Sequence, residues 1–138
     1  MVTVSTPTSS GGSALDVLPV DYIENLAISV ASDTMVELLV YDNRNYQSSL
    51  IHILNSHASK SLIYNIFGSN DYNAGAYPTF NAVTTWKQLL SADKTLTTLT
   101  NGAETLTDNW AWIAIAMKQG VAGAGNESSA KVRIRALK

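Results

Sequence analysis

The sequence contains no cysteine, and few of its residues carry charge. Without cysteine the chain has no disulfide, no thiolate metal site and no cysteine nucleophile, and either redox compartment suits it. Charged residues make up 14% of the chain, and the formal net charge is −2 at pH 7. Electrostatic capture of nucleic acid requires a strongly basic face, so we expect no nucleic-acid partner.

Segments that direct a chain into or across a membrane are also missing. The first residues, MVTVSTPTSSGGSALDVLP, contain no basic region followed by a continuous apolar stretch. They therefore form no recognisable signal peptide. No apolar run approaches the length of a transmembrane helix. We expect a protein that is made in the cytoplasm and has no membrane partner.

Residue combinations that support catalysis are equally scarce. His52 lies in an apolar segment and His57 in a turn, so a core histidine and a surface histidine are favoured over a shared metal site. Asp42 and Asp71 each lie beside two asparagines, but turn formation explains both better than calcium binding does. No G-x-S-x-G, Walker or H-E-x-x-H motif is present. We therefore predict a protein that is not an enzyme, with no catalytic residue, metal or cofactor.

The residues that are abundant favour an all-β fold. With 138 residues the chain has room for one domain with a self-sufficient core. Ser, Thr and Asn supply most of its polarity and suit strands and turns. Short apolar segments at close spacing, separated by turn-forming residues, predict an antiparallel β-sandwich or jelly roll. The expected strands are residues 22–31, 35–41, 48–54, 61–67, 94–100, 104–117 and 130–137.

The connections carry their own signals. Asn101-Gly102 is a strong hairpin sequence, so we predict that residues 94–100 and 104–117 pair around it. Residues 68–84 form a long loop. Residues 86–90 are ambiguous, because Thr85 and Gln88 have the spacing of a capping box and one helical turn would fit there.

The N-terminal segment differs in composition from the rest of the chain. Residues 1–13 are rich in Ser, Thr and Gly and have too few apolar groups to fold alone. We therefore predict an extended N-terminal arm, residues 1–19, and a single β-sandwich domain, residues 20–138. The alternating pattern at the start of the arm predicts a strand that binds a partner's exposed sheet edge; packing on its own sheet is the open alternative. The residues of this strand are Val2, Thr3, Val4 and Ser5.

Alternation along the last strand separates an apolar face from a basic face. The apolar face carries Val132, Ile134 and Ala136, and the basic face carries Lys131, Arg133 and Arg135. A basic row suits an acidic partner or a phosphate backbone. We favour the simpler interpretation, in which this is a solvated edge strand protected by its charge.

Other strands are apolar on both faces. In the segment NWAWIAIAM one face carries Trp110, Trp112, Ala114 and Ala116, and the other carries Ile113, Ile115 and Met117. A sandwich buries one face of each strand, so the second face needs a cover: a loop, the arm or another subunit. The predicted core contains Leu38, Val40, Leu50, Leu62, Ile113, Ile115, Val132 and Ile134.

Aromatic residues supply the remaining candidate site. Tyr72, Tyr77 and Phe80 lie in the long polar loop, where apolar rings need something to pack against, so we predict that they bind a partner. Together with the tryptophans they could also form a sugar-stacking platform. A carbohydrate-binding or adhesion module of the β-sandwich type is therefore the alternative function.

The C-terminal half of the chain has a pattern of strands that resembles a known group of proteins. The pattern is carried by Trp86-Lys87-Gln88-Leu89, Thr95-Leu96, residues 104–113 and Val132-Arg133-Ile134. It resembles small β-sandwich structural proteins of tailed-phage virions, namely capsid decoration (cement) proteins and head or tail accessory proteins. The resemblance implies a virion protein made in the host cytoplasm, which staples a shell through self-association or binding to a capsid shell protein. It carries no motif, so it assigns no binding residues.

Overall fold

The computed structural model describes residues 2–4, 20–21, 26–30, 32–70 and 86–137. In this part of the chain all regular structure is β-strand, in agreement with the predicted fold class. The strands are β1 (Val2–Val4), β2 (Val20–Asp21), β3 (Leu26–Val30), β4 (Val36–Asp42), β5 (Ser48–Asn55), β6 (Leu62–Ser69), β7 (Lys87–Gln88), β8 (Lys94–Leu96), β9 (Asn101–Leu106), β10 (Trp112–Gln119) and β11 (Ser128–Leu137).

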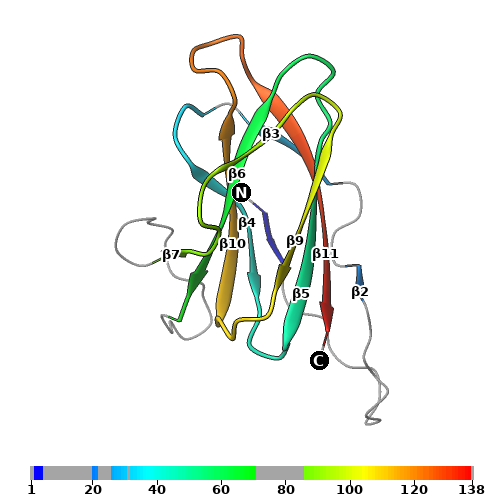
Figure 1. The fold of residues 1–138 in the computed structure, drawn as a ribbon, viewed down its shortest axis with the longest axis vertical. Helices are drawn as coiled ribbons and strands as arrows, with labels where there is room; N and C mark the ends of the chain where they lie inside the picture. Colours follow the sequence, from blue (N-terminus) through cyan, green and yellow to red (C-terminus); the bar gives the residue numbers. More distant parts are fainter. Residues whose placement is uncertain (1, 5–19, 22–25, 31, 71–85, 138) are drawn as a thin grey trace.

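The strands form two sheets that face each other as a sandwich (Figure 1). One, called here the β10 sheet, has the order β1-β4-β10-β6, and both β7 and β8 pair with the far side of β6. The other, the β11 sheet, has the order β11-β5-β9, and both β2 and β3 pair with the far side of β11. All these pairs are antiparallel except β1 with β4.

The core lies between the sheets and follows the alternation of the strands. Ile113 and Ile115 enter it from β10, and Val132 and Ile134 enter it from β11, as predicted. Leu62 is also buried there. The prediction was wrong for Leu50 and correct for the burial of Val40, which lies in a different cluster. The side chain of Leu38 lies outside the described part of the structure.

Both outcomes follow from which residues of β5 and β4 point inward. On β5, Ile51 and Ile53 point inward, so Leu50 lies on the outer face and remains 36% exposed. On β4, Leu39 and Tyr41 occupy the core. Val40 therefore points to the opposite face of the sheet, where it is buried in a second cluster.

The second cluster lies on the outer face of the β10 sheet. Its buried members are Val40, Phe67, Trp86, Trp112, Ala114 and Ala116. The prediction that β10 is apolar on both faces is thus confirmed. Because a single chain buries these side chains, this face gives no reason to place a second subunit on it.

The predicted hairpin at Asn101-Gly102 is wrong. These residues lie inside β9, and the turn falls earlier, where Leu99 has a φ of 55°. The strands before and after this turn, β8 and β9, belong to different sheets, since β8 pairs with β6 and β9 pairs with β5. The buried amide of Asn55 donates hydrogen bonds to the Leu96 and Thr97 carbonyl oxygens, each at 3.1 Å, and so fixes this crossing from the opposite sheet.

The expected strand over residues 104–117 is in fact two strands. β9 ends at Leu106 and β10 begins at Trp112, so the predicted alternation of Trp110 with Trp112 breaks. Trp110 packs against the main core instead. It lies against Gly68, where an added Cβ would approach Trp110 Cδ2 to 2.4 Å. The ambiguous segment beginning at Trp86 contains the short strand β7 on the edge of β6.

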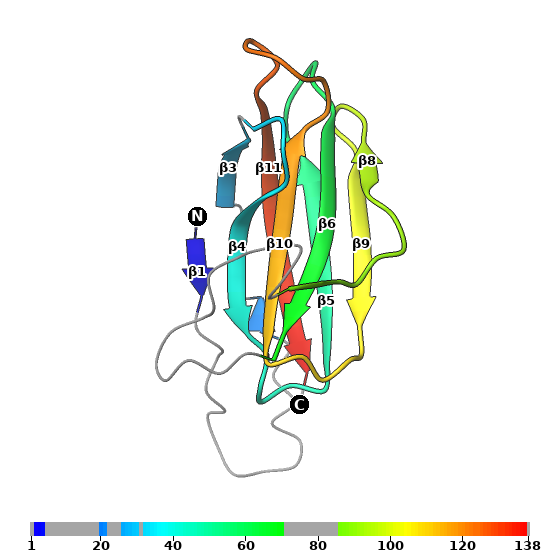
Figure 2. The same cartoon turned by 90° about the vertical axis from the view of Figure 1, so that its left-hand side faces the viewer.

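The first strand, β1, lies beside β4 of its own chain (Figure 2). The two strands are parallel, and Val2 is opposite Leu39 while Val4 is opposite Tyr41. Val2–Val4 therefore pack on a sheet of their own chain, which is the alternative that the sequence left open. Ser5, the fourth predicted residue of that strand, lies outside the described residues.

Candidate functional site

The basic row of β11 lies in the interior of its sheet. β11 is flanked by β5 on one side and by β2 and β3 on the other. The predicted edge position is therefore wrong, because edge protection applies to strands with an unpaired side. The predicted solvated outer face is confirmed for Arg133 and Arg135, which are exposed. Protection of an edge does not explain the charges of Lys131, Arg133 and Arg135.

Neighbouring strands complete the surface around these cations. Lys131 is opposite Leu54, Arg133 is opposite His52, and Arg135 is opposite Leu50 on β5. On the far side of β5 the same positions are opposite Asn101, Ala103 and Thr105 of β9. We call this surface the basic face; its residues are Leu50, His52, Leu54, Asn101, Ala103, Thr105, Lys131, Arg133 and Arg135.

One acidic residue adjoins the basic face, since Asp21 of β2 is opposite Arg135, and three other carboxylates are paired with cations elsewhere. Arg44 binds Asp42, Lys94 Nζ lies 2.8 Å from Glu104 Oε1, and Lys118 Nζ lies 3.6 Å from Asp93 Oδ2. Within the described residues, Lys131 and Arg133 form no ion pair. Positive charge therefore gathers on one face of a protein whose formal net charge is −2.

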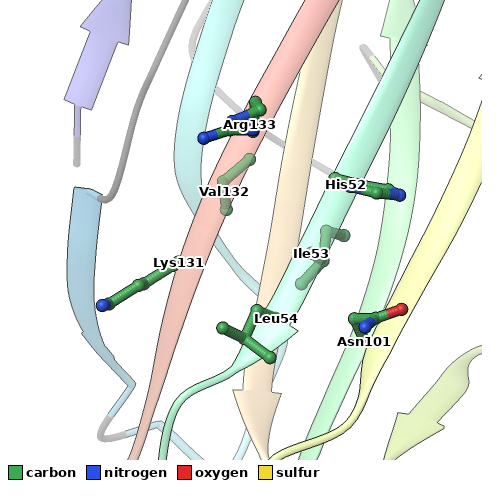
Figure 3. Close-up of a pocket in the computed structure, with 7 residues that line it drawn as sticks. All are labelled: His52, Ile53, Leu54, Asn101, Lys131, Val132 and Arg133. Carbon is green, nitrogen blue, oxygen red and sulfur yellow. The ribbon is translucent and has the colours of Figure 1, made fainter.

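The basic face contains two shallow hollows. The first has a volume of about 200 Å³, and the residues around it come from β5, β9 and β11 (Figure 3). The second, also about 200 Å³, is lined by Leu50, His52, Arg133 and Arg135. Both are open to solvent and share His52 and Arg133, so they form one continuous uneven surface and not an enclosed pocket. That shape suits contact with another macromolecule better than capture of a small molecule.

His52 was assigned to the core from its apolar neighbours in the sequence. The structure instead exposes it on the basic face, because Ile51 and Ile53 take the inward positions of β5. His57 lies in the turn after β5, where its Nδ1 accepts hydrogen bonds from the backbone N–H groups of Ser59 and Lys60. The first histidine is thus available to a partner, and the second holds a loop.

The other cluster of titratable side chains links the two sheets. Tyr64 Oη donates a 2.7 Å hydrogen bond to Glu104 Oε1, which also receives Lys94. Burial, followed by the hydrogen bond and charge of Glu104, raises the pKa of Tyr64 far above its ordinary value. Gly102 leaves room for this phenol, since a Cβ there would lie 2.6 Å from Tyr64 Oη. With its tyrosine buried in the core, this cluster ties β6 and β8 to β9.

The candidate calcium sites were at Asp42 and Asp71. Asp42 is held by the side chain and backbone N–H of Arg44; partial burial opposes its ionisation, but these contacts prevail and lower its pKa. Asp71 lies outside the described residues. Among the residues that the structure describes, no group of three or more His, Asp or Glu side chains could hold a metal ion.

Tryptophans do not form an exposed platform in the described part of the chain. Trp86 and Trp112 are buried, and Trp110 is partly buried against the core. The Arg44 guanidinium lies 5.1 Å from the ring centre of Trp112, a cation–π distance. The predicted partner-binding rings of Tyr72, Tyr77 and Phe80 lie outside the described residues.

Fold and site together define a two-sheet, mainly antiparallel β-sandwich with a basic outer face. Comparison with known proteins adds no family: no family model matches the chain, and no curated protein matches it in sequence. In the described part of the chain, no helix is long and apolar enough to cross a membrane.

Proposed function

We propose that this protein is a structural component of a virus particle, where it acts as a capsid decoration (cement) or head–tail accessory protein. It works by assembly, with copies of itself or with a capsid shell protein. The observation that carries the proposal is the nested order in which its strands pair. Catalysis forms no part of it, because the titratable cluster around Tyr64 is a link between sheets.

Eight strands, taken in chain order, pair from the outside inward. They are β3, β4, β5, β6, β8, β9, β10 and β11. The first pairs with the last, β4 with β10, β5 with β9, and β6 with β8. This nesting supports a jelly roll, which is a long antiparallel hairpin rolled into two sheets and a recurrent architecture of viral capsid proteins and lectins. Fold alone does not specify function, so this support is an analogy.

The N-terminal strand is a second observation that supports the same proposal. β1 is not one of the eight nested strands, and it adds to the open side of β4 by parallel pairing. The roll is complete without it, so the same edge of a neighbouring copy could receive this strand in exchange. Val2, Thr3, Val4 and Ser5 are accordingly the proposed partner-binding residues of the arm.

A carbohydrate-binding or adhesion module is the second candidate, since lectins share the jelly-roll architecture. Burial of Trp86 and Trp112 disfavours it, because stacking of a sugar needs an exposed ring. We therefore rank assembly above sugar binding.

The proposal is tested by the mass of the purified protein in solution and by deletion of residues 1–13. We expect the full chain to form discrete oligomers or to bind isolated capsid shells, measured by light scattering and co-sedimentation. The deletion should weaken that assembly while its melting temperature changes little, because the nested strands remain intact.

Two results would contradict this. If the deleted protein is unfolded by circular dichroism, β1 is an essential part of the fold and not an exchangeable strand. If the full chain stays monomeric and ignores shells, but binds an immobilised glycan array, the carbohydrate-binding candidate replaces the structural one.

A further inference from the structure

We propose that the basic face docks an acidic, partly apolar segment of a partner protein. This inference rests on the proposed assembly function and deepens it by naming one contact surface and the chemistry of its partner. The surface is distinct from the edge of β4, which receives the N-terminal strand.

The first argument is that no internal role accounts for the charges of Lys131 and Arg133. β11 is an interior strand, so its cations do not guard an edge. Val132 and Ile134, on the opposite face of β11, pack into the main core. Lys131 and Arg133 have no ion pair in the described part of the chain, whereas Lys94 and Lys118 have partners. An acidic partner would provide the missing complement.

The spacing of the cations indicates the shape of that partner. Side chains at alternate positions of a strand lie roughly 6.6–6.8 Å apart on one face. Carboxylates at alternate positions of an extended segment have the same spacing, so such a segment laid along β11 meets Lys131 and Arg133 in turn. The match does not need Arg135, which lies opposite Asp21. Arg133 can bind a carboxylate through two parallel N–H donors, which fixes the register of the contact.

The leucines indicate that the partner is a protein and not a polyanion. Leu50 is 36% exposed and Leu54 is half-buried, and both lie directly across from the cations. Phosphate and sulfate chains gain little from apolar contact, whereas protein interfaces combine apolar centres with charged rims. The basic face has no tryptophan, tyrosine or phenylalanine on which a nucleic-acid base would stack.

The test measures the affinity of three synthetic probes of equal negative charge for the full chain. One is a short extended peptide of glutamate and leucine, the second replaces its leucines with serine, and the third is a single-stranded DNA oligonucleotide. We expect the glutamate–leucine peptide to bind most tightly. Arg133→Glu should weaken it roughly tenfold or more, since the substitution replaces an attractive contact with a repulsive one.

Matched variants separate the specific contact from general charge. Lys87→Glu makes the same charge change on exposed β7 of the other sheet, and it should alter affinity by less than about twofold. Leu50→Ser should abolish the preference for leucine over serine in the peptides while leaving the serine peptide's affinity unchanged.

Three outcomes would overturn the inference: equal loss in the Lys87 and Arg133 variants, tighter binding of the oligonucleotide than of either peptide, or no binding of any probe. None of these decides the proposed function, which depends on oligomer mass and shell binding. A protein that assembles but ignores the probes would keep the proposed function and lose this docking surface.

Discussion

Two core tyrosines show how burial acts on a single titratable group. Tyr41 is fully buried between the sheets, and that burial, only partly opposed by Ser49, raises the pKa of its phenol far above the ordinary value of 10.0. Tyr64 is shifted in the same direction by burial and by Glu104. In both cases the folded protein holds the neutral form, while the unfolded chain ionises normally.

This difference predicts a loss of stability in alkali. For a group whose folded pKa is raised, stability is fully present below the unfolded pKa and falls as the pH rises above it. Above pH 10 the free energy of unfolding should therefore fall, with Tyr41 contributing about 1.4 kcal/mol per pH unit. Urea unfolding between pH 8 and pH 12 measures the slope.

Removal of the phenol supplies the control for the alkaline effect. Tyr41→Phe should flatten the slope above pH 10, and a combined change with Tyr64→Phe should flatten it further. An unchanged slope in the double variant would mean that other groups cause the alkaline loss, and that the buried phenols ionise without penalty.

Among the strands, β11 has one buried face and one face with exposed charges. Its inward side chains are buried, with Ile134 fully enclosed in the core, while Arg133 is exposed on the opposite side. Truncation of a fully buried isoleucine removes apolar contacts and leaves a cavity. The two faces of this one strand should therefore respond very differently to substitution.

Ile134→Ala should lower the free energy of unfolding by about 2–5 kcal/mol. Arg133→Ala, one position away, should change it by less than about 0.5 kcal/mol, because an exposed side chain loses little on truncation. Chemical denaturation of both variants measures the difference. Similar losses in the two would contradict the inward and outward assignment of this strand.

Single strands could be predicted from the sequence, but their partners could not. Alternation of apolar and polar residues is local, so the faces of β10 and β11 follow directly from the order of residues. The interior position of β11 depends on β3, whose Leu26 pairs with Val132 far along the chain. The basic face was therefore visible as a row of charges, whereas its location in the sheet required the structure.

Turns were the least predictable elements for a related reason. Asn101-Gly102 has the residues of a tight hairpin, yet the chain crosses between sheets just before it, where Leu99 takes positive φ. Hydrogen bonds between the two sheets, from Asn55 to the Leu96 carbonyl and from Tyr64 to Glu104, hold the chain on either side of the crossing. At this point tertiary packing overrides the local turn propensity of Asn101-Gly102.

The whole molecule has a topology in which distant parts of the chain must meet. β3 near one end pairs with β11 near the other, and each inner pair of the nested order closes inside the last. Forming such contacts costs loop-closure entropy before the core is gained, which slows folding in β-sandwich proteins. The candidate basic face inherits this property, since it combines strands from both halves of the chain.

Refolding from urea should accordingly occur over milliseconds to seconds, the range of proteins dominated by non-local pairs. Deletion of residues 1–13 should leave the refolding rate nearly unchanged, because β1 joins the sheet from outside the nested strands and contributes little to the transition state. Stopped-flow tryptophan fluorescence follows the reaction, with buried Trp86 and Trp112 as reporters. A large slowing by the deletion would place β1 within the folding nucleus, and exchange of that strand between copies would then no longer be a simple addition to a finished roll.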